Sequence, residues 1–273
     1  MSAQNESTKV DLEQPSRGAA ESGGMSFPRQ VIAGRCYLVT RRCTQRQFLL
    51  RPDDETNNAF LYCLAYAAQE IAVDVVAFVA SSNHYHAVVV DPNGVIPRFL
   101  ELFHKLIAKH QNALRRRREN MWSSEQTSLV ELAGPDDVLA KVVYTLANPV
   151  KDHLVERAHH WPGATSLAAT VGGRTLRARR PIRFFRKQGA MPAHVQLRCT
   201  RMPGFEQIAG SEYRRLLEDA IAGVESAAAA ERATSGQRLL GRKAVLALAP
   251  EGRPTSVKSV SAIKPQLAAR NAT

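Results

Sequence analysis

The chain has 273 residues, 44% of them hydrophobic, which suffices for the core of one good-sized domain with appendages or of two small domains. It lacks any run of about eighteen apolar residues, and residues 1–24 are polar, so we expect no transmembrane helix, no secretory signal and a cytoplasmic protein without a membrane partner. The formal net charge of +12 favours a polyanionic partner, most simply nucleic acid.

The four cysteines are scattered along the chain and form no C-x-x-C pair. This spacing argues against a structural zinc site and, in a cytosolic protein, against disulfides. We therefore expect small buried thiols at Cys36, Cys43, Cys63 and Cys199.

The first half of the chain alternates between strand and helix patterns. Residues 1–28 have few large apolar side chains, which predicts a disordered N-terminal segment. Alternating side chains predict a strand over 34–40, and capping residues at 53–56 predict a helix that extends to about Ile71. Two β-rich runs, 73–80 and 84–90, flank turn residues and predict a hairpin.

Two further helices complete the predicted core. One should span about Ile96–Arg118 and the other about Pro135–Ala147, where Asn148 and Pro149 should end it because proline disfavours helical geometry in the preceding residue. The order of elements indicates an α+β fold in which helices cover an antiparallel sheet. Beyond residue 166 the periodicity fades, so we expect a basic, partly ordered C-terminal extension over 167–273, with its best helix at Ser211–Ala222.

Two histidines separated by one residue begin the second strand of the predicted hairpin. His84 and His86 leave a strand on the same face, so both imidazoles can reach one ion, while Tyr85 points to the core. Imidazoles with oxygen ligands suit a divalent metal, Mg²⁺ or Mn²⁺, when phosphate completes the shell. The alternative is two ordinary strand histidines, because H-x-H is a weak pattern.

A tyrosine and an asparagine share one face of the last predicted helix, because Tyr144 and Asn148 are four residues apart. A phenolic oxygen can attack a phosphodiester if a metal polarises the phosphate. The amide oxygen of Asn148 could then be a third metal ligand beside His84 and His86. The alternative is a core aromatic residue followed by a helix stop.

These two segments resemble motifs of one enzyme family. Residues 83–90 (NHYHAVVV) resemble the N-H-hydrophobic-H strand of HUH single-tyrosine transposases. Residues 144–151 (YTLANPVK) resemble the Y-x-x-x-N-P-V segment of the REP-associated tyrosine transposase branch. The resemblance covers about residues 29–166 and implies an HUH transposase/nuclease domain. Such a domain has a ferredoxin-like antiparallel sheet with helices packed on one face and the active site on the other.

The resemblance also implies a reaction and a role for each site residue. A divalent metal on His84, His86 and Asn148 would position a phosphate of single-stranded or hairpin DNA, and Tyr144 would attack it. The products would be a 5′-phosphotyrosine link and a free 3′-hydroxyl, and a second strand's 3′-hydroxyl could reverse the step. We expect such an enzyme to be a monomer or a homodimer. The segment before Trp122 lacks the family's glycine, which concerns substrate handling.

Arginine-rich segments are the candidate DNA contacts. The alternatives are a solvated helix end for the first run of arginines and a basic linker for the second, in which phenylalanines at 184 and 185 suit stacking with single strands. The arginines around the first strand could line the same groove. The predicted DNA-binding residues are Arg41, Arg42, Arg46, Arg115, Arg116, Arg117, Arg118, Arg179, Arg180, Arg183, Arg186 and Lys187.

Two functions remain open from the sequence. The first is a transposase or nickase with a tyrosine nucleophile, and the second is a domesticated relative that binds DNA or RNA hairpins without cutting them. An unrelated metal hydrolase would need more carboxylates near the histidines than the sequence offers.

Overall fold

The structure, a computed structural model, describes residues 31–254. The disorder predicted for residues 1–28 and the end of the C-terminal extension, 255–273, lie outside the described residues. The main elements in chain order are β1 (Arg35–Arg42), α1 (Asp54–Ile71), β2 (Asp74–Ala80), β3 (His84–Asp91), α2 (Ile96–Leu114), β4 (Ser128–Leu132), α3 (Pro135–Lys151), α4 (Leu167–Thr170), β5 (Leu176–Arg179), β6 (His194–Leu197), α5 (Gly210–Ser235) and α6 (Arg242–Ala247). Within 31–254, every helix is too short or too polar to cross a membrane.

The strands β1 to β4 form an antiparallel sheet with the strand order β2-β3-β1-β4. The connection β1-α1-β2-β3-α2-β4 with this order is the ferredoxin-like arrangement, so the predicted α+β fold class is confirmed. β1 and β3 are the two central strands, and their side chains alternate between two separate hydrophobic cores.

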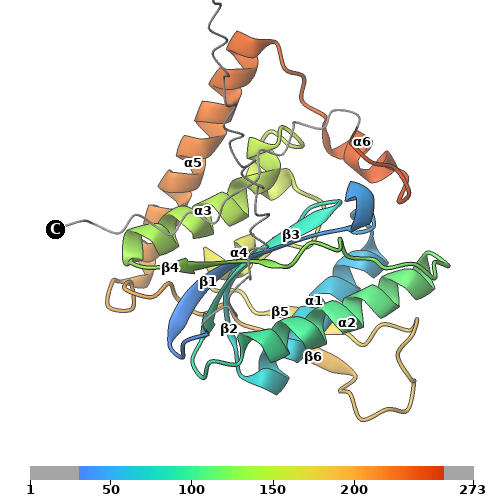
Figure 1. The fold of residues 1–273 in the computed structure, drawn as a ribbon. Helices are drawn as coiled ribbons and strands as arrows, with labels where there is room; N and C mark the ends of the chain where they lie inside the picture. Colours follow the sequence, from blue (N-terminus) through green and yellow to red (C-terminus); the bar gives the residue numbers. More distant parts are fainter. Residues whose placement is uncertain (1–30, 255–273) are drawn as a thin grey trace, which may run out of the picture. The chain divides into compact units, whose positions relative to one another are not determined.

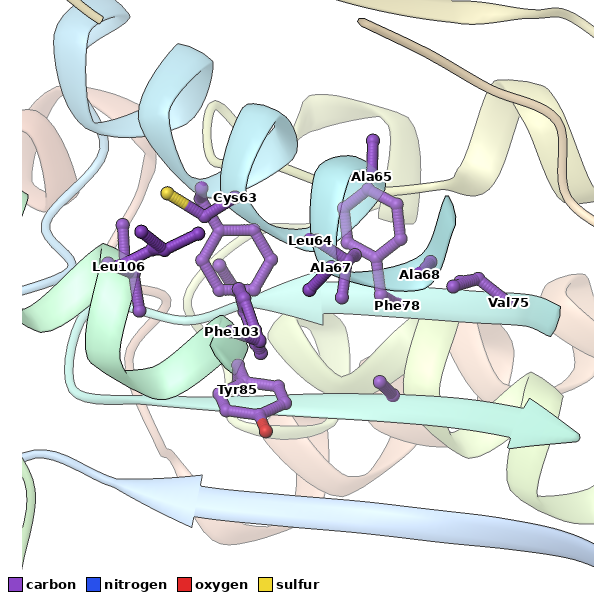
Figure 2. Close-up of a cluster of buried hydrophobic side chains, with 14 of the residues drawn as sticks. Cys63, Leu64, Ala65, Ala67, Ala68, Val75, Phe78, Tyr85, Phe103 and Leu106 are labelled. Atoms are coloured by element: carbon purple, nitrogen blue, oxygen red, sulfur yellow. The ribbon is translucent and has the colours of Figure 1, made fainter. Parts of the chain in front are cut away.

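One face of the sheet packs against α1 and α2 (Figure 1). α1 begins after Asp53, whose Oδ1 accepts a hydrogen bond from the backbone N–H of Thr56 at 2.7 Å. The helix buries the strand side chains that point to this face of the sheet. Figure 2 shows Phe78, Tyr85 and Phe103 together in this core. Tyr85 is fully buried there, as its position between the two histidines predicted.

The opposite face is covered in part by α3, on which α5 packs (Figure 1). Leu38, Val79 and Val88 give this face an apolar surface that needs cover, and Val142 and Leu146 of α3 supply it. α3 therefore covers part of the sheet face that was expected to be open. The first residues of β3, with His84 and His86, lie on this same face.

Two helix ends differ from the sequence predictions. α2 ends at Leu114 instead of Arg118, because Arg116 adopts a left-handed conformation (φ 54°). α3 continues through Pro149 to Lys151, because a proline in the last turn removes only one backbone hydrogen bond and the chain end is held by the bond from Asp152 N to Asn148 O at 2.9 Å. Asn148 therefore stays helical.

The described part of the C-terminal extension packs onto the core. α5 is longer than the predicted Ser211–Ala222 helix, and its buried residues Tyr213, Leu217 and Ile221 join the core beneath α3. β5 and β6 form an antiparallel hairpin against α1. The boundary at residue 166 remains a prediction.

The N-terminus of α1 generates a testable prediction. Asp53 also pairs with Arg115 at 3.3 Å, a side chain that is only 7% exposed. Asp53→Ala should lower the free energy of unfolding by about 1–3 kcal/mol, because it removes the helix cap and leaves a buried guanidinium without its carboxylate. Chemical denaturation would measure this, with the exposed Asp54→Ala as the matched control.

The same loss should depend on pH. Burial raises the pKa of Asp53, but the Thr56 hydrogen bonds and the Arg115 charge outweigh it, so the folded pKa lies below the ordinary 3.8. The contribution of Asp53 should be complete above pH 4 and disappear as the pH falls through the folded pKa. An equal loss in both variants, or one that persists at low pH, would contradict this assignment.

Candidate active site

His84 and His86 lie on the sheet face that α3 covers in part. In the β1–β3 register Arg42 is opposite His84 and Thr40 is opposite His86, and residues opposite each other share a face. The two imidazole centroids are 4.9 Å apart. The geometry needed for both rings to approach one ion is present.

The Nδ1 atom of each ring is held by a neighbouring side chain. His84 Nδ1 is 2.7 Å from Asn83 Oδ1, and His86 Nδ1 is 2.7 Å from Thr40 Oγ1. Because an amide oxygen only accepts, the neutral His84 ring donates from Nδ1 and keeps a lone pair on Nε2. Sequence reasoning missed Thr40, since only the strand register places it beside His86.

Tyr144 extends from α3 toward these rings. Its hydroxyl is 3.5 Å from His86 Nε2, and the two ring centroids are 5.1 Å apart. The side chain is half-buried, and the ammonium of Lys151 lies 5.2 Å from the ring centroid. Tyr144 is therefore not sealed in an apolar interior.

Asn148 joins the tyrosine to the histidines. It is buried one helical turn after Tyr144, and its Oδ1 accepts a hydrogen bond from Ser81 Oγ at 3.0 Å. Its side chain also hydrogen-bonds with His84 and with Tyr144. The four-residue spacing predicted that Asn148 and Tyr144 share a helical face, and Asn148 lies within α3.

Burial and nearby cations set the protonation of the site. Burial, followed by the charge of Arg42, lowers the pKa of His84 to about 4. Burial also lowers the pKa of His86 well below its ordinary value, with the charges of His84 and Arg42 adding to the effect. Both imidazoles are neutral at pH 7, which is the form that binds metals.

Tyr144 is a protonated phenol at pH 7. Burial and the charge of Asp152 raise the pKa of Tyr144, whereas Arg42 and Asn148 lower it in part. The protein residues alone thus leave the phenol neutral. A cation near its oxygen would favour the phenolate.

The donor atoms fit a divalent cation that keeps open positions. Among residues 31–254, no three His, Cys, Asp or Glu side chains form a metal-binding group. The available set is two imidazole nitrogens and the amide oxygen of Asn148, so water or phosphate would have to supply the remaining ligands.

A groove of about 590 Å³ lies between α3 and α5, and Tyr144 is one of its lining residues. Leu139, Val143 and Val224 line its apolar part, and Lys151 also lines it. The groove gives the tyrosine ring access from outside the core.

The structure separates the arginines that the sequence grouped together. Arg42 and Arg46 lie close enough to lower the pKa of His84, so they belong to the surroundings of the site. Arg41 is on the other face and donates to the carbonyls of Ser123 and Glu125.

The next run of predicted contacts lies at the C-terminal end of α2. Arg115 binds Asp53, Thr56 and the Leu49 carbonyl inside the fold, so we leave it out of the proposed DNA surface. Arg116, Arg117 and Arg118 follow the end of α2.

The arginines around the first strand and the basic segment with the two phenylalanines were expected to line one groove, and the structure shows that they do not. The β5–β6 hairpin packs on α1, and therefore lies on the opposite side of the sheet from α3, the helix that carries Tyr144 (Figure 1). This segment carries the predicted contacts Arg179, Arg180, Arg183, Arg186 and Lys187.

Comparisons with known proteins show similarity to transposase structures. No protein-family profile and no curated protein match the chain. The structure is similar to a REP-associated tyrosine transposase bound to a REP hairpin, with 17% identity and a TM-score of 0.46 over 62% of this chain and 95% of the other. It is also similar to a proposed transposase from Deinococcus radiodurans R1, with 17% identity and a TM-score of 0.32 over 41% of this chain and 89% of the other.

Proposed function

We propose that this protein cleaves and rejoins single-stranded or hairpin DNA, with Tyr144 as the nucleophile and a divalent metal as cofactor. The observation that carries the proposal is the 3.5 Å approach of the Tyr144 hydroxyl to His86 Nε2, although 58 residues separate them in the chain. The His84 and His86 ring centroids are 4.9 Å apart, and Asn148 hydrogen-bonds with His84, which supports a shared metal site.

The metal would be held by His84 Nε2, His86 Nε2 and Asn148 Oδ1. Bound Mg²⁺ or Mn²⁺ would polarise the phosphate and stabilise the charge that develops during attack. Thr40 and Asn83 hold the rings in place through their Nδ1 atoms. Arg42 and Arg46 add positive charge beside the histidines, which attracts the DNA phosphate.

The chemical step exchanges one phosphodiester for another. The Tyr144 oxygen forms a bond to phosphorus and gives up its proton, while the bond from phosphorus to the 3′ oxygen breaks and that oxygen takes up a proton. The DNA 5′ phosphate remains on Tyr144. A 3′-hydroxyl of a second strand can attack this link in the reverse sense, which transfers the strand.

The second candidate function is hairpin binding without cleavage. The observation that favours it is the donor set, which contains no carboxylate ligand among the described residues. It predicts that DNA binding survives the loss of Tyr144 and of the metal, and that no covalent adduct ever forms.

Replacement of the nucleophile should separate the two functions. Tyr144→Phe should reduce the covalent protein–DNA adduct to background and leave DNA affinity within about threefold, because only the attacking oxygen is lost. A labelled hairpin oligonucleotide with Mg²⁺ or Mn²⁺, analysed on a denaturing gel, measures the adduct. Tyr66→Phe on α1 is the matched control and should keep it. An adduct in the Tyr144→Phe protein would contradict the proposed nucleophile.

Formation of the DNA adduct should depend on the metal, so EDTA should abolish the adduct and added Mn²⁺ should restore it. Metal binding should in turn depend on the two histidines, which can be measured in the absence of DNA. In calorimetric titrations of the protein alone with Mn²⁺, His84→Ala and His86→Ala should each weaken binding at least about tenfold, because each removes a ligand. His159→Ala, in a different part of the chain, should bind as the wild type does. Unchanged adduct formation in EDTA would exclude the metal-dependent mechanism.

The Thr40 hydroxyl should tune metal affinity through His86. Thr40→Val keeps the shape of the side chain but removes the partner of Nδ1, so Mn²⁺ affinity should fall about ten- to hundredfold. Thr40→Ser should restore most of it. Thr234→Val near the end of α5 provides the control, and equal affinities in Thr40→Val and wild type would refute the positioning role.

A further inference from the structure

The loop between β5 and β6 exposes large apolar side chains in a strongly basic segment. Ile182 is 89% exposed and Phe184 is 46% exposed. Residues 171–200 contain no Asp or Glu. They contain eight cationic residues, namely Arg174, Arg177, Arg179, Arg180, Arg183, Arg186, Lys187 and Arg198.

The exposure is built into an anchored loop. Phe185 is buried, with its ring centroid 5.6 Å from that of Tyr62, and the Tyr62 hydroxyl donates to the Pro192 carbonyl at 2.6 Å. Arg180 donates to three carbonyls on the far side of the loop, at residues 187, 189 and 191. Because Phe185 holds the loop down, its neighbours Ile182 and Phe184 are held outward.

Cations from two elements surround these side chains. The ammonium of Lys109, on α2, lies 5.3 Å from the Phe184 ring centroid. Arg186 and Lys187 are exposed on the loop itself. Arg183 pairs with Glu55 at 2.8 Å, an exposed contact that solvent screens. The local surface therefore combines positive charge with two unpacked apolar groups.

We propose that this surface, which we call the loop patch (Lys109, Ile182, Phe184, Arg186 and Lys187), binds single-stranded nucleic acid away from the cleavage site. Phosphates would lie on the cations, and unstacked bases would pack on Phe184 and Ile182. The loop patch belongs to the β5–β6 hairpin and α2, on the side of the sheet that α1 covers, whereas Tyr144 is on α3, which packs on the other face (Figure 1). The inference rests on the proposed function only in taking the bound strand as part of the DNA that Tyr144 cuts.

Nucleic acid suits the patch better than a lipid surface. The apolar part consists of two side chains on a loop, whereas binding to a bilayer surface needs a larger apolar face, such as that of an amphipathic helix. A ring under a cation and next to further cations matches the alternation of base and phosphate along a single strand.

The test measures equilibrium binding of a labelled single-stranded oligonucleotide without a hairpin. All proteins carry Tyr144→Phe, and EDTA is present, so that no cleavage occurs. Ile182→Ser and Phe184→Ser should each weaken binding about five- to hundredfold, with an unchanged dependence of affinity on salt, because they remove contacts to bases. Arg186→Gln should instead reduce the slope of log affinity against log salt by about one.

Leu239→Ser is the matched control, since Leu239 is also an exposed apolar residue (38%) beside an arginine. It should bind as the parent protein does. An oligonucleotide of abasic sites keeps the phosphates and removes the bases, so on it Phe184→Ser and the parent should bind equally.

Three outcomes would overturn the proposal. The first is that Ile182→Ser and Phe184→Ser bind the oligonucleotide as tightly as Leu239→Ser does. The second is that the loss of affinity in Phe184→Ser persists on the abasic strand, which would exclude base contacts. The third is that the parent protein cosediments with phosphatidylserine vesicles through Ile182 and Phe184, while neither residue affects DNA binding. Failure of the Tyr144 adduct would reject the proposed function without deciding any of these outcomes.

Discussion

The pairing of β1 with β3 is the constraint on which the site depends. It places Thr40 opposite His86 and Arg42 opposite His84, so that two imidazoles, a hydroxyl that holds one of them and a cation share one sheet face. The apolar remainder of that face draws α3 across it, because Leu38, Val79 and Val88 must be buried. The packing of α3 then brings Tyr144 to His86. The apolar residues that bind α3 and the polar residues of the site therefore follow one another along the same face of the same strands.

The environment of the site favours neutral ligands and a neutral phenol. Burial depresses the pKa of both histidines and raises that of Tyr144, and Arg42 acts on all three groups. In such a site the imidazoles are in the form that binds cations, Arg42 adds positive charge, and the negative charge of Asp152 acts on the phenol. In such surroundings a bound divalent cation and a phosphate would neutralise each other's charge.

The segments beyond residue 166 serve two different sides of the molecule. α5 packs on α3 and forms one wall of the groove beside Tyr144, so it supports the helix that carries this tyrosine. The β5–β6 hairpin packs on α1 and presents its cations on the other side of the sheet. A basic sequence segment therefore cannot be assigned to the candidate site from its charge alone, because charge along the chain carries no information about the layer of the fold in which the segment lies.

The sequence by itself determined the local features. Period-two alternation predicted that His84 and His86 leave one face and Tyr85 the other, and the four-residue spacing placed Tyr144 and Asn148 on one helical face, because these relations depend only on backbone geometry. Only the tertiary structure decided which strand lies beside β3, and hence that Thr40 holds His86. It also decided that α3 continues through Pro149 and that Arg115 is bound inside the fold. Packing between distant segments can outweigh the local tendency of the backbone, which involves only one or two hydrogen bonds. The local sequence pattern does not reveal which segments will pack together.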